Sequence, residues 1–126
     1  SNVLSKPDGS PLIVDFASIR AGPACLDPVF LELSVIFHMD SPLRNQEWPT
    51  LEQAERWFDL DAYLYKCPAA DFVEACRSWA VSASPSIDLA SAVYIEAARQ
   101  LKYDDTNHEL AIAIATAAAR RLILAQ

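Results

Sequence analysis

Glycine is absent from this 126-residue chain after residue 22, and this most constrains its fold. The two glycines, Gly9 and Gly22, both lie in the first third. The remainder is rich in alanine and leucine, which have high helix propensity. Apolar residues make up 52% of the chain, enough for a packed core and too many for a disordered segment. We therefore expect residues beyond about 40 to form helices that pack together.

The first third instead has the pattern of a β-hairpin that ends on a carboxylate. Two short apolar runs, Val3–Leu4 and Leu12–Val14, flank the turn-forming sequence Lys6–Ser10. The second run is continuously apolar, so we expect it to be covered on both faces. Asp15 follows it directly, and a buried carboxylate needs a cation or hydrogen-bond donors in place of water. A simpler alternative is that Asp15 caps a turn or pairs with Arg20.

Helix-capping signals divide the rest of the chain. We expect a first helix from Asp27, as N-cap, to about Met39, with its core stripe at Val29, Phe30, Leu33, Ile36 and Phe37. Glu32 lies off the centre of this stripe and is most simply part of a solvated face. A capping box at Thr50–Gln53 predicts a short helix to about Phe58. Residues 41–49 and 59–68 are expected to be connections.

Three longer helices are predicted after residue 68. The first spans about 69–81, with Phe72, Cys76 and Trp79 on one side. The second spans about 87–102, with Ser86 as its cap and Ile87, Tyr94 and Leu101 at heptad spacing. The third starts from a capping box at Thr106–Glu109 and runs to about Leu124. Because it is apolar nearly all round, this last helix should be central in the domain or covered by a partner. The three tryptophans are expected in the core.

Composition excludes several functions. The net charge of −7 disfavours a nucleic-acid partner, which would need clustered Lys and Arg. No apolar run reaches the roughly 18 residues of a membrane span. His38 and His108 have no partners at metal-ligand spacing. Cys25, Cys67 and Cys76 form no CxxC pair, which favours free thiols in the cytoplasm.

The opening stretch carries a family resemblance. Asn2-Val3-Leu4, followed by a hairpin and then Ile13-Val14-Asp15-Phe16, resembles the catalytic segment of the aminoglycoside phosphotransferase and choline kinase group, which have kinase-like folds. Gly22-Pro23, Asp27 and Leu31-Glu32 continue the likeness. It is closer still to bacterial phosphotransferase-like domains of multidomain conflict and signalling proteins, the ternary-complex-associated domains, whose late helix ends like Arg99–Tyr103.

The resemblance implies a metal site. Asn2 and Asp15 would hold Mg²⁺ on ATP, since Mg²⁺ prefers carboxylate and amide oxygens. Asp27 and Glu32 would give structural support, although Asp27 serves equally well as a helix N-cap. If Asn2 belongs to this motif, it is native; the alternative is that Ser1-Asn2 is the remnant of a cleaved tag.

Parts of the family pattern are missing from this chain. The His-x-Asp that supplies the catalytic base would precede residue 1, the nucleotide lobe is absent, and Ala17 replaces the glycine of Asp-Phe-Gly. We therefore expect a mainly α fold, an N-terminal β-hairpin followed by about five helices, as a fragment of a kinase-like C-terminal lobe. It would be one domain over 1–126, with the hairpin and catalytic remnant in 1–26 and a helical bundle in 27–126.

Two functions follow. In the first, the chain is the C-terminal lobe of a cytoplasmic phosphotransferase, dependent on Mg²⁺ and ATP in the full-length protein, with the missing nucleotide lobe as its partner. The fragment itself would be inactive and hold no cofactor. In the second, it is a non-catalytic helical interaction domain of a bacterial signalling or conflict protein, with a protein partner on its terminal helix. The acidic helical part could line a site for a cationic acceptor, but no residue requires this.

Overall fold

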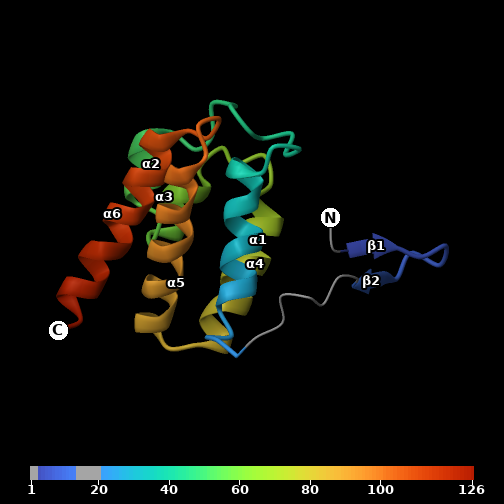
Figure 1. Cartoon of the computed structure of the whole chain (residues 1–126), viewed down its shortest axis with the longest axis horizontal. Helices are drawn as coiled ribbons and strands as arrows, with labels where there is room; N and C mark the ends of the chain where they lie inside the picture. Colours follow the sequence, from blue (N-terminus) through green and yellow to red (C-terminus); the bar gives the residue numbers. More distant parts are fainter. Residues whose placement is uncertain (1–2, 14–20) are drawn as a thin grey trace.

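The computed structural model describes residues 3–13 and 21–126. Six α-helices form the body of this described part (Figure 1). They are α1 (Leu26–Phe37), α2 (Leu51–Glu55), α3 (Leu60–Leu64), α4 (Ala70–Ala83), α5 (Ser86–Arg99) and α6 (His108–Leu124). A 3₁₀ turn, η1 (Gln100–Lys102), continues α5.

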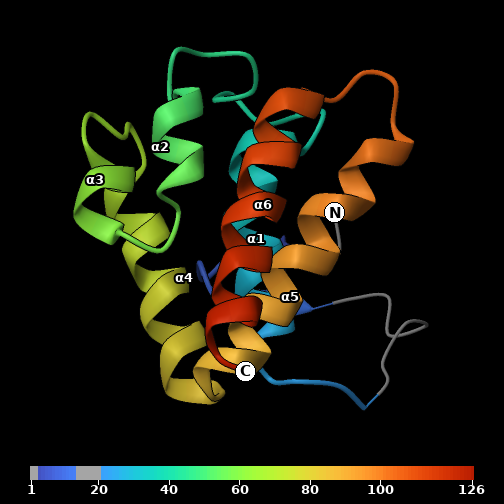
Figure 2. The ribbon, with the colours of Figure 1, turned by 90° about the vertical axis from the view of Figure 1, so that its left-hand side faces the viewer.

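The helices pack around one core. α5 and α6 lie side by side, α1 packs against both α4 and α5, and α2 packs against α6 (Figures 1 and 2). Small buried side chains at Ala97 on α5 and Ala111 and Ala118 on α6 let the helices approach closely, while Val93 and Ile114 fill the space between the elements. This packing leaves the outer sides of α5 and α6 at the surface.

Residues 3–13 lie at one side of the helical body (Figure 1). Their two three-residue strands, β1 (Val3–Ser5) and β2 (Pro11–Ile13), pair with each other in antiparallel register, with Val3 opposite Ile13. The turn between them contains Gly9 at φ 80°, a conformation that glycine adopts without steric cost. The Gly9 N–H donates to the Lys6 carbonyl at 2.9 Å.

The predicted fold class is wrong for the folded domain. The domain is all-α, with six α-helices in the described part where about five were expected. Within residues 3–13 and 21–126, β1 and β2 pair only with each other and no helix packs on their sheet. The physical reason is length, since two three-residue strands present too little apolar surface to organise a core.

The helix caps in the structure confirm some of the predicted N-cap residues and correct others. The capping box of Thr50 and Gln53 is confirmed, since each side chain bonds the backbone N–H of the other. Asp59 caps α3, where the sequence predicted only a connection, and its carboxylate accepts from the Ala62 N–H at 3.2 Å. Two cap predictions are wrong. Asn107, and not Thr106, caps α6, and Ser86 is already inside α5.

The buried face of α4 also differs from expectation. On α4 the buried residues are Val73, Cys76, Arg77 and Ala80. Phe72 and Trp79, predicted to be internal, are 44% and 48% exposed. The face is set by Arg77, which must point inward to reach a buried carboxylate on α1. Trp48 and Trp57 are confirmed as core residues.

Lys66 provides a test of backbone strain. It is exposed, with φ 57°, in the left-handed region that costs an L-residue roughly 1–2 kcal/mol. We expect Lys66→Gly to raise the free energy of unfolding by about 0.5–1 kcal/mol, since part of the relief is offset by the freer unfolded chain. The measurement is urea denaturation. Lys66→Ala is the control and should change stability by less than about 0.5 kcal/mol. Equal stability of the two variants would refute the interpretation.

Candidate functional site

The two predicted metal ligands, Asn2 and Asp15, lie outside the described residues. The paired residues Val3 and Ile13 are their nearest described neighbours in the chain. Within 3–13 and 21–126, no group of three or more His, Cys, Asp or Glu side chains is placed to hold a metal ion. The metal site therefore remains a prediction from the sequence.

Asp27 is not the N-cap of the first helix, as was predicted. Cys25 holds that position without a side-chain cap, and its backbone N–H donates to Ser84 Oγ at 3.1 Å. Asp27 lies exposed in the first turn of α1, where a negative charge interacts favourably with the helix dipole. The hydrogen bond between Cys25 and Ser84 joins the start of α1 to the end of α4.

Glu32 is the largest departure from expectation, since it is buried and not part of a solvated face. Its side chain forms a bidentate ion pair with Arg77. Arg77 Nη2 donates to Glu32 Oε1 at 2.7 Å, and Nε donates to Oε2 at 3.0 Å. The two residues are only 2% and 6% exposed. The pair fastens α1 to α4 in the middle of the core.

Aromatic groups complete the surroundings of this pair. Arg77 Nη1 donates to the Trp57 carbonyl at 2.8 Å, and the guanidinium carbon lies 3.4 Å from the centre of the Trp57 ring. Burial raises the pKa of Glu32, and the hydrogen bonds and charge of Arg77 act in the opposite direction. The Trp57 indole N–H also favours the charged carboxylate, although it makes no hydrogen bond of its own within the described part. The charges of Glu32 and Arg77 thus compensate each other inside the core.

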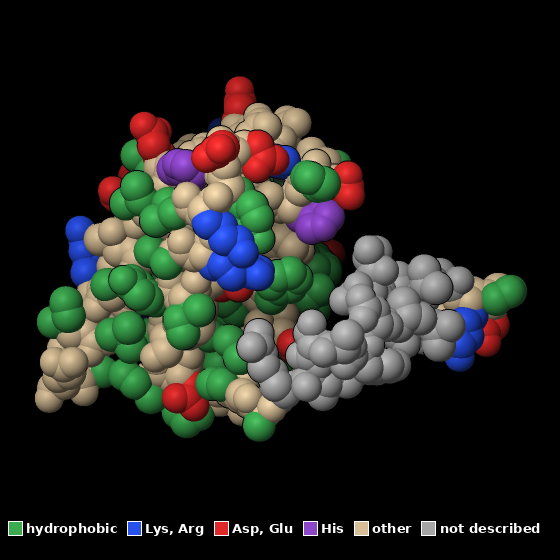
Figure 3. Space-filling model, viewed as in Figure 1, with side chains coloured by type: hydrophobic (Ala, Val, Ile, Leu, Met, Phe, Trp, Pro, Cys, Tyr) green, Lys and Arg blue, Asp and Glu red, His purple; other side chains and the backbone are tan. Residues whose placement is uncertain are grey.

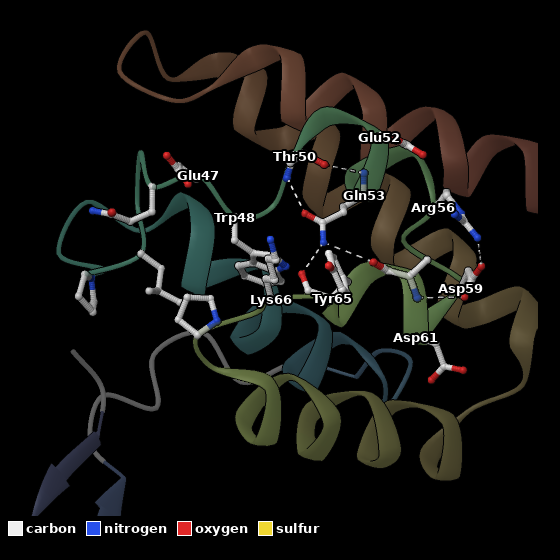
Figure 4. A pocket seen from close by; sticks show the side chains of 15 residues that line it. Glu47, Trp48, Thr50, Glu52, Gln53, Arg56, Asp59, Asp61, Tyr65 and Lys66 are labelled. Atoms are coloured by element: carbon white, nitrogen blue, oxygen red, sulfur yellow. Dashed lines mark hydrogen bonds and ion pairs between the residues drawn. The ribbon is translucent and has the colours of Figure 1, made fainter.

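A broad groove of about 1340 Å³, with both charged and apolar lining residues, lies beside α2 and α3 (Figure 4). Gln53 spans it from inside, donating to the Tyr65 carbonyl at 2.7 Å. The charged groups along it do not converge, because Arg56 is paired with Asp59 at 2.6 Å and Glu47 lies far along the groove from Asp61. An open groove with dispersed charges offers neither a nucleophile nor a positioned acid and base.

A smaller cavity of about 320 Å³ lies between α1 and the end of α5. Phe30, Phe37 and Tyr103 give it aromatic walls. It has two carboxylates. Glu96 is shared between Arg99 at 2.6 Å and Gln100 at 3.2 Å, and Asp105 is paired with Arg44 at 2.9 Å. This internal pairing leaves no charge free to select a ligand.

The third surface feature is apolar and covers the outer sides of α5 and α6. Ile87, Tyr94 and Leu101, at seven-residue spacing along α5 and η1, are 44%, 44% and 41% exposed. Ile112 and Ile123 on α6 are 53% and 67% exposed. Figure 3 shows hydrophobic side chains spread over the face that α5 and α6 form. We call these five residues the α5–α6 face.

The α5–α6 face consists of large apolar side chains that do not contribute to the core. Its members are large and apolar, and none of them is needed to fill the core, since alanines already occupy the contact between α5 and α6. Single exposed apolar residues are normal, whereas large apolar patches mark surfaces that another molecule covers. The heptad spacing noted in the sequence is therefore present, but it faces outward.

Cysteine reactivity tests the burial pattern. All three cysteines are free, and burial raises the pKa of Cys76 to about 11. At pH 8 roughly one Cys76 in a thousand is then a thiolate, the reactive form. Burial also raises the pKa of Cys67, but Cys67 is partly accessible. We expect iodoacetamide to label Cys67 first and Cys76 far more slowly. Mass spectrometry of the folded protein over time measures both labelling rates.

The matched control for this labelling is Cys67→Ser. This variant should lose the fast labelling of Cys67 and keep the slower labelling of the remaining cysteines. Labelling of Cys76 as fast as Cys67 in the folded protein would contradict the buried position of Cys76 on α4.

Comparisons with protein-family models, curated proteins and solved structures found no match for this chain. No helix in the described residues is long and apolar enough to cross a membrane. The assignment of a function therefore depends on the surfaces and contacts of the chain itself.

Sequence reasoning missed Arg77 altogether. A signal was available, because Glu32 lies three residues after Val29 and one before Leu33, both core residues of α1. A carboxylate so close to the buried stripe needs a cation. Arg77 lies among Val73, Cys76 and Ala80 at helical spacing on α4, which makes it the matching partner.

Proposed function

We propose that this chain is a helical docking module that binds an apolar helix of another polypeptide along the α5–α6 face. The observation that supports it is the exposure of Ile87, Tyr94 and Leu101 along α5 and η1, together with that of Ile112 and Ile123 on the neighbouring helix α6. A seven-residue repeat presents one side of a helix to a partner that crosses it at a small angle. An apolar surface on two adjacent helices suits an amphipathic helix, which packs its apolar face against it.

The energetics favour a contact spread over several residues. Covering the exposed part of each large side chain contributes roughly 1 kcal/mol. Association also costs several kcal/mol of lost freedom. Binding therefore requires most of the face to be covered at once, and a charge placed in it should weaken binding strongly.

A dye-binding experiment tests this face without knowledge of the partner. We expect Tyr94→Lys and Ile112→Lys each to reduce bis-ANS fluorescence on the folded chain by about half. The free energy of unfolding should change by less than about 1 kcal/mol, because both side chains are half exposed. Urea denaturation measures the second quantity.

Phe72→Lys is the matched control, because Phe72 on α4 is as exposed as Tyr94, at 44%, but lies outside the α5–α6 face. It should leave dye binding nearly unchanged. If all three variants reduce bis-ANS binding equally, the α5–α6 face has no special affinity and the proposal fails.

We also propose that the protein works in the cytoplasm. Its three cysteines are unpaired although two of them are buried, as expected of a chain that folds in a reducing compartment.

A second candidate function is Mg²⁺- and ATP-dependent phosphoryl transfer by a longer protein that includes this chain. The observation that favours it is the strand register, which pairs Val3 with Ile13, the described residues next to the predicted ligands Asn2 and Asp15. A Mg·ATP titration of the longer protein and its Asp15→Asn variant tests it. Equal affinity would rule out Asp15 as a ligand, and turnover by residues 1–126 alone would contradict the need for a missing lobe.

A further inference from the structure

A cavity of about 450 Å³ opens between α4, α5 and the C-terminal part of α6. Figure 2 looks onto this side of the body, where the end of α6 lies between α4 and α5. Its walls are apolar and come from four elements and the link after α2: Phe58, Leu60, Val81, Ile87, Leu89 and Leu124. A volume of a few hundred Å³ is typical of small-molecule sites.

The ionisable groups of the cavity are unusual for this protein. Although the chain carries a net charge of −7, the charged residues that line the cavity are Arg77 and Arg121, with no Asp or Glu among its described lining residues. Of the three cavities considered in residues 3–13 and 21–126, this is the one whose charges favour an anion.

Arg77 has hydrogen-bonding capacity to spare. A guanidinium has five N–H groups, and three of those on Arg77 donate to Glu32 and the Trp57 carbonyl. The second N–H on each of Nη1 and Nη2 has no acceptor among the described residues, although the side chain is only 7% exposed. Buried donors normally find a partner, so a ligand oxygen in the cavity would satisfy them.

Arg121 supplies charge from the rim. Its guanidinium carbon lies 5.3 Å from the centre of the Phe58 ring, and it makes no ion pair within the described part of the chain. Arg77 is neutralised by Glu32, so Arg121 provides the positive charge that remains uncompensated. The two arginines thus play different roles, one as hydrogen-bond donor and one as countercharge.

We propose that this cavity binds a medium-chain fatty acid, with its carboxylate between Arg121 and Arg77 and its hydrocarbon chain against the apolar walls. A cation would be repelled by the uncompensated charge of Arg121, and a neutral hydrocarbon would leave the Arg77 donors unsatisfied. A peptide carries backbone N–H and C=O groups that need partners when buried. Apart from the arginines, Ser86 is the only lining residue here with a polar side chain, so a peptide fits poorly. This proposal does not rest on the α5–α6 face, although Ile87 contributes to both.

Calorimetric titration with decanoate, octanoate and decanol tests the assignment. We expect decanoate to bind about tenfold more tightly than octanoate, because each buried methylene contributes about 0.8 kcal/mol. Decanol, of the same chain length but uncharged, should bind at least fivefold more weakly than decanoate. No binding of decanoate below its micelle concentration, or equal binding of decanol, would overturn the proposal.

Two neighbouring arginines give a matched pair of variants. Arg121→Gln should weaken decanoate about fivefold and leave decanol unchanged. Arg120→Gln should change neither, since Arg120 does not line the cavity. Both residues are exposed, so both variants should fold. Equal loss in the two variants would mean a general charge effect and would refute the site.

The role of Arg77 is tested by NMR of the wild-type protein, because a substitution of Arg77 would disturb the core. In an NMR titration, the Arg77 side-chain N–H signals should shift with decanoate and not with decanol. Tyr94→Lys should leave decanoate affinity unchanged. Unmoved Arg77 signals would overturn the assignment, because the carboxylate would then not contact Arg77. A decanoate affinity that falls with Tyr94→Lys would also overturn it, because the ligand would then lie on the α5–α6 face.

Discussion

Arg77→Met lowers the free energy of unfolding by about 3–5 kcal/mol. The substitution leaves the Glu32 carboxylate buried without its cation, and breaking one side of a buried pair costs this much. It also removes the hydrogen bond to the Trp57 carbonyl and the contact with the Trp57 ring. Urea denaturation followed by far-ultraviolet circular dichroism measures the change, since Trp57 fluorescence would itself respond to the substitution.

The double variant Glu32→Leu with Arg77→Met is the control for this prediction. Removing both charges should recover a large part of the loss, because a buried ion pair can be replaced by apolar side chains at little cost. If Arg77→Met alone costs less than about 1 kcal/mol, water must reach the pair in solution, and the buried geometry of Glu32 and Arg77 is contradicted.

Trp57→Ala is expected to cost about 3–5 kcal/mol as well. Trp57 is fully buried, and its ring contacts Arg77, Phe58 and Tyr63. Truncation leaves a cavity and removes the aromatic surface that supports the guanidinium. Denaturant unfolding again provides the measurement.

The comparison of two Trp→Phe variants sharpens this result. Trp57→Phe loses only the weak influence of the indole N–H on Glu32, because this N–H makes no hydrogen bond in the described part. Trp48→Phe loses the bond from its indole N–H to the Tyr63 carbonyl at 2.8 Å. We expect Trp48→Phe to be the more destabilising by about 1 kcal/mol. The reverse order would show that Trp57 has a polar partner in solution.

The predictable parts of the fold were those with local causes. The lack of glycine and the side-chain caps indicated the helices, and Thr50 with Gln53 marked the start of α2 correctly. α3 was missed because five residues give too short a pattern for periodicity to be recognised. The inward face of α4 was missed because it depends on Arg77 meeting Glu32, 45 positions apart in the chain.

The site was less predictable than the fold. The heptad of Ile87, Tyr94 and Leu101 was seen in the sequence, but spacing alone does not say whether a stripe faces the core or solvent. The alanines between α5 and α6 decide this, since they fill the contact and leave the larger residues outside. Asn2 and Asp15 lie outside the described residues, so their metal-binding role remains a prediction.

Site-specific photocrosslinking in the natural host tests the central proposal most directly. A benzophenone amino acid at position 94 or 112 of the natural protein should give one discrete crosslinked product. That product should map to an apolar helix of the partner and disappear when Leu101→Lys is added. The same group at position 72, equally exposed in the wild type but on α4, should give no such product. Absence of a product at both 94 and 112, or an equal product at 72, would contradict a docking role for the α5–α6 face.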